Sequence, residues 1–295
     1  MRKRIVIRGA DIGFSEVFDL GAFKAVDAGI VSCLDVMLDG RSVVKALNMI
    51  KERPWISYGW HRHFWNRPVC DPKEVPSLVD ESGRFRWGHK HKEKMAEATY
   101  EDARKEFEAE LQMAYEITGR YPDATNSDGA DIPFENAFLD VCRKYDIAIN
   151  IQVDKLYTTD ERYRDLDYHM RVINPLTDVE LKDGEKISPF DLKLVNEYDP
   201  AAKIINTNLN TGKSFLISCH PGYLDDIVLA ESRCNIHRVK ELQGYLDPRV
   251  KNWIIENDLE LVNQRDILFG TNEYQEHLRI INSPLWTGNY NNESK

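Results

Sequence analysis

The chain lacks the features that mark several large classes of protein. It has only five cysteines in 295 residues, and no two of them form a CxxC pair. An odd number of scattered cysteines favours reduced, mostly buried thiols over a disulfide framework. No apolar run approaches the length of a membrane span, and the basic start MRKRIVIRGAD leads into no long apolar region with a small-residue cleavage site. We therefore predict a cytoplasmic protein with no membrane partner.

Positive charge is also in short supply. The chain has 39 Lys and Arg against 49 Asp and Glu, which gives a formal net charge of -10. A negative protein has no unspecific attraction to DNA, RNA or anionic lipid. The composition therefore predicts no nucleic-acid partner and favours a neutral or cationic small molecule.

The common nucleotide-binding and hydrolase motifs are missing. Gly9 and Gly13 do not form a GxGxxG, and GxxxxGK[ST], GxSxG and HExxH are absent. These absences disfavour a nucleotide site and a serine hydrolase.

The first part of the chain alternates between strand and helix patterns. Residues 4–8, 30–38 and 55–61 are apolar runs typical of buried strands, and the apolar spacing in 18–25 and 43–50 predicts two helices between them. This order predicts an α/β fold with a parallel sheet covered by helices, either open or closed into a barrel.

The rest of the chain is less regular. Residues 70–91 form a long insertion rich in turn formers and charges, which we expect to cover the site. We predict a single domain over residues 1–269 and a C-terminal surface extension over 270–295. Further elements are expected at 107–119, 134–142, 147–151, 214–219, 248–254 and 259–263, and residues 154–200 have no assignable pattern.

Three predicted strands end in a side chain that can bind a metal or transfer a proton. Asp11 follows the first strand, His61 the third, and His220 the strand at 214–219. The ends of parallel strands share one face of a sheet, so we expect these groups to converge. A divalent metal held by carboxylate and imidazole can activate water at neutral pH. Ser15 is well placed to cap the first helix, which leaves Asp11 available for chemistry.

Each of these residues also has a structural interpretation. A histidine at a strand end is commonly a hydrogen-bonded structural group, and the segment NSDGADIP, which contains Asp128, has the composition of an ordinary turn. Four aromatic residues fit either stacking on a sugar or packing in the core, namely Trp60, Trp65, Trp87 and Tyr223.

Four segments of the chain resemble the YdjC-like carbohydrate deacetylases, which include chitooligosaccharide deacetylases. They are IVIRGADIGFSEVFDLGAFKAVDAGIVS, GWHRHFWNRPV, PSLVDESGRF and SCHPGYLDD, and they occur in the family's order between about Arg4 and Ile267. The resemblance implies a (β/α) barrel, often a homodimer, that removes acetyl groups from N-acetylated sugars. It also implies a divalent metal ion (Zn, Mg or Mn) held by one Asp and two His, with an Asp as base.

The resemblance assigns roles to individual residues. His61 matches a metal-binding histidine, and His220 matches the HPGY histidine that protonates the leaving amine or stabilises the oxyanion. The family's first loop carries an acidic pair, whereas GADIGFS has one Asp, so Asp11 is either ligand or base, and we predict the ligand. The family's second metal histidine would fall in NSDGAD, where Asp128 stands. Asp128 is thus a third predicted ligand. The base is supplied by Asp128, by another acid of that loop, or by no residue.

Three further residues are predicted to bind substrate. Arg67 can orient a substrate oxygen, Tyr223 can stack on a sugar, and His63, two residues after His61, can reach the site from a loop. The sequence therefore predicts a metal-dependent hydrolase acting on a small N-acetylated carbohydrate. A sugar-binding homologue that lost turnover with the acidic pair, and a hydrolase of phosphorylated disaccharides, remain open as alternatives.

Overall fold

The fold comes from a computed structural model of the chain. The residues that it describes are 2–88, 91–127, 129–149, 163, 167–173, 196–232 and 234–290.

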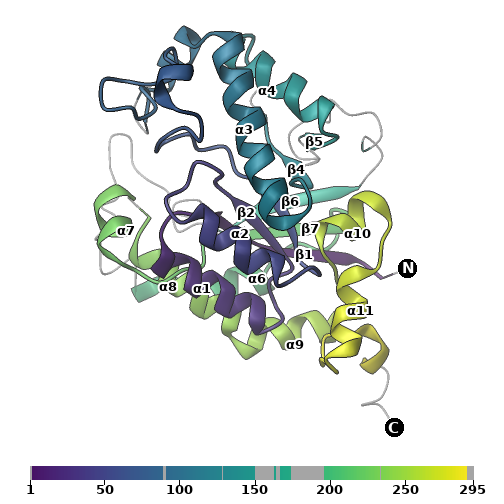
Figure 1. The fold of residues 1–295 in the computed structure, drawn as a ribbon. Helices are drawn as coiled ribbons and strands as arrows, with labels where there is room; N and C mark the ends of the chain where they lie inside the picture. Colours follow the sequence, from purple (N-terminus) through teal and green to yellow (C-terminus); the bar gives the residue numbers. More distant parts are fainter. Residues whose placement is uncertain are drawn as a thin grey trace.

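One parallel sheet forms the centre of the molecule (Figure 1). Its strands follow the order β5-β4-β3-β2-β1-β7-β6, and β8 pairs with the start of β1. All of these pairs are parallel. The strands are β1 (Arg4–Ile12), β2 (Cys33–Val36), β3 (Ser57–Trp60), β4 (Ala124–Thr125), β5 (Ala148–Ile149), β6 (Tyr168–Val172), β7 (Ser214–Cys219) and β8 (Glu260–Leu261).

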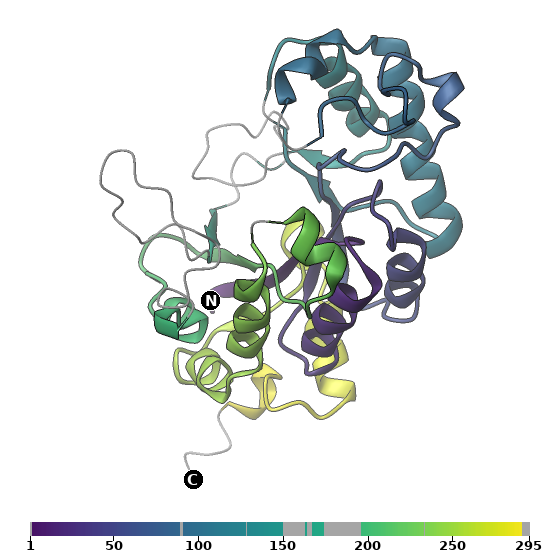
Figure 2. The ribbon, with the colours of Figure 1, turned by 90° about the vertical axis from the view of Figure 1, so that its left-hand side faces the viewer.

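Helices cover the outside of the sheet. In Figures 1 and 2, α3 and α4 lie together at one end of the molecule, and α1, α8 and α9 lie around the other. The helices are α1 (Glu16–Asp27), α2 (Val43–Lys51), α3 (Tyr100–Thr118), α4 (Pro133–Lys144), α6 (Pro200–Ile205), α7 (Asp226–Glu231), α8 (Ile236–Leu246), α9 (Pro248–Glu256), α10 (Gln264–Phe269) and α11 (Glu273–Ile280).

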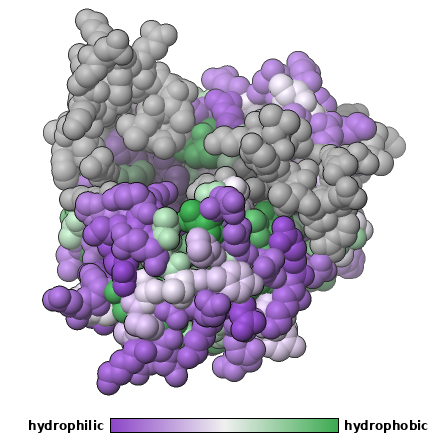
Figure 3. Space-filling model, turned by 90° about the horizontal axis from the view of Figure 1, so that it is seen from above, coloured by the Kyte–Doolittle hydropathy of each residue, from purple (hydrophilic) through white to green (hydrophobic). Residues whose placement is uncertain are grey.

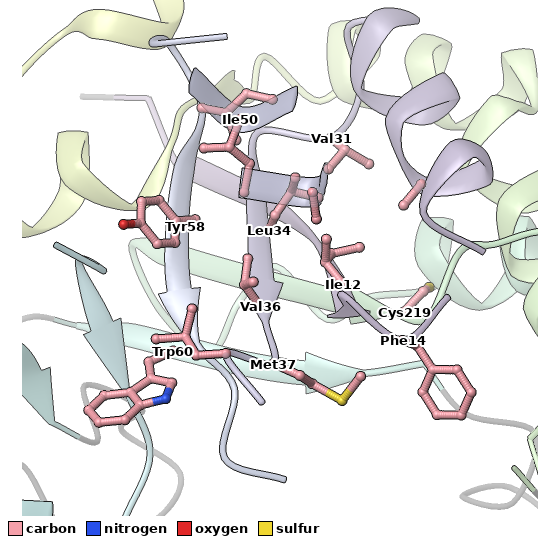
Figure 4. Close-up of a cluster of buried hydrophobic side chains, with 14 of the residues drawn as sticks. Ile12, Phe14, Val31, Leu34, Val36, Met37, Ile50, Tyr58, Trp60 and Cys219 are labelled. Carbon is pink, nitrogen blue, oxygen red and sulfur yellow. The ribbon is translucent and has the colours of Figure 1, made fainter. Parts of the chain in front are cut away.

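The strands send alternate side chains to two different cores, as the period of two requires. Leu34 and Val36 of β2 and Tyr58 and Trp60 of β3 point to the outer layer beneath the helices (Figure 4). Both faces are buried, which explains why these strands are almost continuously apolar in sequence.

The inner core shows that the sheet curls. Val6 of β1, Ala148 of β5 and Tyr168 of β6 belong to one buried cluster, although β5 and β6 are the two edges of the sheet within the described residues. A single buried cluster that includes residues of both edges fits a sheet that curls around it. The predicted α/β fold of barrel type is therefore confirmed.

The segment that leads from β3 into the insertion is fastened to the domain by buried carboxylates. Glu106 of α3 accepts hydrogen bonds from the backbone N–H groups of Val69 and Cys70, at 2.7 and 3.0 Å. Asp39 accepts from the N–H groups of Trp65 and Asn66 at 2.7 and 3.0 Å. These contacts fix the segment that begins at the end of β3.

Residues after 270 pack on the domain. Tyr274 and Leu278 of α11 are completely buried, as is Leu285, and the Tyr274 hydroxyl donates to the carbonyl of Val31. The predicted boundary at residue 270 stays a prediction.

The described helices include none long and apolar enough to cross a membrane. Seen from above, the described residues that are visible are mostly hydrophilic, with some hydrophobic ones in the middle of the view (Figure 3).

Candidate active site

Asp11 lies at an irregular end of β1. Its φ of 63° is in the left-handed region, and the register between β1 and β2 shifts between Gly9 and Ile12. Such bulges re-aim side chains and are concentrated next to active sites. The Oγ of Ser15 accepts a hydrogen bond from the N–H of Phe18 and caps α1, as predicted, so Asp11 is not needed there.

Three metal-ligand side chains meet at this position. The Oδ1 of Asp11 lies 2.8 Å from Nε2 of His61 and 3.2 Å from Nε2 of His63, and the two Nε2 atoms are 2.7 Å apart. Asp11 is 4 % exposed, whereas both histidines are half-buried. The cluster is thus open to solvent on its histidine side.

A second carboxylate stands behind His61. The Oδ2 of Asp35, on β2, faces Nδ1 of His61 at 3.3 Å and Nη1 of Arg8 at 3.1 Å. A carboxylate beside Nδ1 favours the hydrogen on that nitrogen and leaves the lone pair on Nε2, as in many metal-binding histidines. The lone pair then faces the carboxylate of Asp11, an arrangement that a cation between them would stabilise.

Arg238 of α8 holds the other oxygen of Asp11. Its Nη2 donates to Oδ2 at 2.7 Å, and its guanidinium lies over the rings of Phe14 and Phe18. Burial by itself would raise the pKa of Asp11, but Arg238, with smaller contributions from His63 and His220, lowers that pKa well below its ordinary value. Asp11 is therefore ionised at neutral pH.

His220 follows β7 and is paired with Glu241, one turn after Arg238 on α8. The Oε2 of Glu241 lies 3.4 Å from Nδ1 of His220, and Oε1 accepts a hydrogen bond from the hydroxyl of Tyr198 at 2.9 Å. Burial works against the charged imidazolium, but the carboxylates of Asp11 and Glu241 outweigh it and raise the pKa of His220. His63 differs, because burial and the neighbouring His61 lower its pKa to about 4.

The other predicted residues are placed differently. Asp128 lies outside the described residues. Arg67 is exposed, and its guanidinium lies against Gly83. Tyr223 is half-buried beside α1, with Nζ of Lys24 5.9 Å from its ring centre. Neither residue joins the Asp11 cluster, and their substrate-binding roles stay predictions.

The four aromatic candidates also divide. Trp60 and Trp87 are each 1 % exposed, and their indole N–H groups donate to Glu110 and to the carbonyl of Phe64. Both are core residues, so stacking on a sugar is wrong for them. Trp65 is half-buried and packs on His63, with ring centres 3.7 Å apart.

Sequence reasoning missed Asp35, Arg238 and Glu241. Asp35 was hidden inside an apolar strand, where a single acid gives no periodic signal. Arg238 and Glu241 belong to a helix that an apolar pattern could not find, because the face it buries is largely charged. A usable signal was their spacing with Leu242 and Tyr245, which places all four on one face.

The residues present fit a divalent cation. One carboxylate oxygen and two imidazole nitrogens converge, no two of them more than 3.2 Å apart, and this donor set suits Zn²⁺ or Mn²⁺ while leaving positions for water. The Asp35 carboxylate, 3.3 Å from Nδ1 of His61, lies where metal-binding histidines usually have an outer partner. The ligands that geometry supports are Asp11, His61 and His63.

The chain also matches a known protein family. The sequence model of the YdjC-like protein family matches residues 4–256. The chain belongs to the YdjC-like family.

Named relatives cover nearly the whole YdjC-like chain. A carbohydrate deacetylase of Clostridium beijerinckii is 26% identical over 274 residues, which are 90% of this chain and 100% of that protein. A chitooligosaccharide deacetylase of Salmonella newport is 21% identical over 266 residues, covering 87% and 96%.

One solved structure supports the fold. It is a protein of Enterococcus faecalis named for a suspected role in cellobiose-phosphate cleavage, with a TM-score of 0.62 and 20% identity over 89% of this chain and 98% of that one.

Proposed function

We propose that the protein is a metal-dependent hydrolase that removes acetyl groups from N-acetylated sugars or small oligosaccharides such as chitooligosaccharides. The observation that carries this proposal is the convergence of Asp11, His61 and His63 on one point, with His220 close enough to Asp11 to influence its charge. The relatives named as carbohydrate deacetylases supply the substrate class.

The ionisation states suit these roles. Asp11, His61 and His63 would hold a divalent cation that lowers the pKa of bound water and polarises the acetamide carbonyl. A carboxylate with a strongly lowered pKa is a weak base, so Asp11 is the ligand rather than the base. His63 stays neutral near pH 7, as a ligand must.

His220 has the properties of the proton donor. The carboxylates of Glu241 and Asp11 raise its pKa and increase the protonated fraction near neutral pH. Glu241 faces Nδ1, so Nε2 is the nitrogen left to protonate the amine as the acetyl group departs. The base stays open between Asp128, which was predicted first as a metal ligand, another acid of the NSDGAD loop, and no residue at all.

The test is acetate release from N-acetylated chitooligosaccharides. Chelator-treated protein should release none, Zn²⁺ or Mn²⁺ should restore release, and His61→Ala should abolish it. His169→Ala is the matched control, because His169 is also paired with an aspartate but lies on β6. Saccharide binding measured by calorimetry without acetate release would instead establish the sugar-binding alternative.

A second candidate, a phosphorylated disaccharide as substrate, is favoured by two arginines. Arg41 and Arg84 both approach the Oε1 of Glu231, so one carboxylate faces two cations. Arg41 and Glu231 line a small hollow that Trp65 also lines. A gain in kcat/KM on phosphorylating the same N-acetylated disaccharide, lost in Arg41→Ala, would support it, and equal values would exclude it.

A further inference from the structure

A second group of metal-ligand side chains lies beside the site described above. His220 follows β7, Cys234 lies between α7 and α8, and Glu241 is on α8. One ligand atom from each of the three lies within 4.8 Å of the others. The group shares no residue with Asp11, His61 and His63.

The backbone of Cys234 is held in place, but its thiol has no hydrogen-bond partner among the described residues. Its backbone N–H donates to the Oγ of Ser232, and its carbonyl accepts from the Nε of Arg238. The Sγ atoms of Cys33 and Cys70 donate to oxygen atoms, whereas within the described residues Sγ of Cys234 makes no such bond.

The charges around this group would balance on binding a cation. Glu241 is completely buried, and its carboxylate faces the half-buried imidazole of His220. Arg238 is already neutralised by Asp11. The two positive charges of a divalent cation are cancelled by the Glu241 carboxylate and a Cys234 thiolate. A neutral group costs less free energy to bury than a charged one.

We propose that His220, Cys234 and Glu241 form a second metal site that selects Zn²⁺. Thiolate and imidazole ligands favour Zn²⁺ and are poor ligands for Mg²⁺ and Mn²⁺. Binding replaces the thiol proton, which is released to solvent, by the metal. Burial, with Glu241 beside it, raises the pKa of this thiol to about 12, so the free thiol stays protonated until zinc binds.

Occupancy of this site has a consequence that rests on the proposed function. Zinc would take an imidazole nitrogen of His220 and the carboxylate that supports it, so the proton donor would be lost. Excess Zn²⁺ should therefore inhibit acetate release, whereas excess Mn²⁺ should not.

The first test measures metal bound per chain after dialysis, by mass spectrometry of the elements. The wild type should hold two Zn²⁺ but one Mn²⁺, and Cys234→Ser should hold one Zn²⁺. His61→Ala should also hold one Zn²⁺, because only the first site is damaged. Cys70→Ser, a half-buried cysteine far along the chain, is the control and should hold two.

The second test uses Co²⁺, which gives a thiolate charge-transfer absorption band only when bound by cysteine. The band should appear in wild type, Cys70→Ser and His61→Ala, and be absent in Cys234→Ser with unchanged circular dichroism. Equal zinc content in wild type and Cys234→Ser, or no band in the wild type, would overturn the site. Absence of acetate release with every metal would overturn the proposed function and leave these two readings unaffected.

Discussion

At the scale of single residues, His61 lies between two carboxylates, each of which is paired with an arginine. Arg8 and Asp35 lie on one side of the imidazole, and Asp11 and Arg238 on the other. The ring is therefore fixed from both sides, and its Nε2 is presented to the solvent-facing cluster.

Removing the charge of Asp35 should weaken metal binding without removing a ligand. In Asp35→Asn the contact to Nδ1 of His61 loses its charge and Arg8 loses its ion-pair partner, so we expect the affinity for metal to fall about 10- to 100-fold. Isothermal titration with Mn²⁺ measures this. Asp167→Asn, which alters the remote Asp167–His169 pair, should bind normally, and an unchanged affinity in Asp35→Asn would refute the role.

Asp19 should make stability depend on pH. Its carboxylate accepts hydrogen bonds from Gly13 and Ser42, but burial outweighs them and raises its pKa from 3.8 to about 7. Between these pH values the folded chain holds a proton that the unfolded chain releases, so the free energy of unfolding should fall as pH rises from about 4 to about 7.

Urea unfolding of Asp19→Asn at pH 5 and pH 8 tests this expectation. The variant carries no charge, so its stability should change less between the two pH values than that of the wild type. Asp27→Asn, an exposed acid of the same helix, should keep the wild-type dependence. Parallel behaviour of wild type and Asp19→Asn would contradict the assignment.

At the scale of elements, apolar strands were predictable and polar or short ones were not. The strands at 4–8, 30–38, 55–61 and 214–219 were recovered because both of their faces are buried and largely apolar. β6 was not, because its residues after Tyr168 are half-buried and mixed in character. α8 was missed although it carries two charged residues of the site, since charges buried in pairs look like solvent-exposed ones in sequence.

The sequence predicted the convergence of Asp11 and His61 but not the full ligand set. His63 was expected to reach the site from a loop and to contact substrate rather than the metal. β3 ends at Trp60, so His63 follows a loop and turns back to the cluster. That turn depends on contacts to Asp39 and α3, which are remote in sequence and leave no local signal.

Glu106 should stabilise the loop that carries His63. In Glu106→Gln one oxygen acceptor is lost, and a backbone N–H of Val69 or Cys70 loses its bond, which costs about 1–3 kcal/mol. Hydrogen exchange of these two amides should quicken and the urea midpoint should fall. Glu108→Gln, a less buried acid of the same helix, should leave both unchanged.

At the scale of the whole molecule, the last described helix contributes to the stability of the domain. Leu278 is completely buried, whereas Ile280 of the same helix is 69 % exposed. We expect Leu278→Ala to lower the free energy of unfolding by about 2–5 kcal/mol and Ile280→Ala by less than about 0.5 kcal/mol. Thermal unfolding of the two variants measures this difference. Equal losses of stability would mean that α11 is not part of the cooperative unit.

The position of α8 links two tasks. Arg238 fixes the carboxylate at the end of β1, and Glu241, one helical turn later, supports the histidine at the end of β7, the neighbouring strand. A slide or rotation of this one helix would disturb charge at the cation ligand and proton supply to the leaving group together. An insertion or deletion between residues 232 and 237 would shift α8 and should therefore impair metal binding and proton donation together. A ligand that moved α8 would likewise change both functions at once.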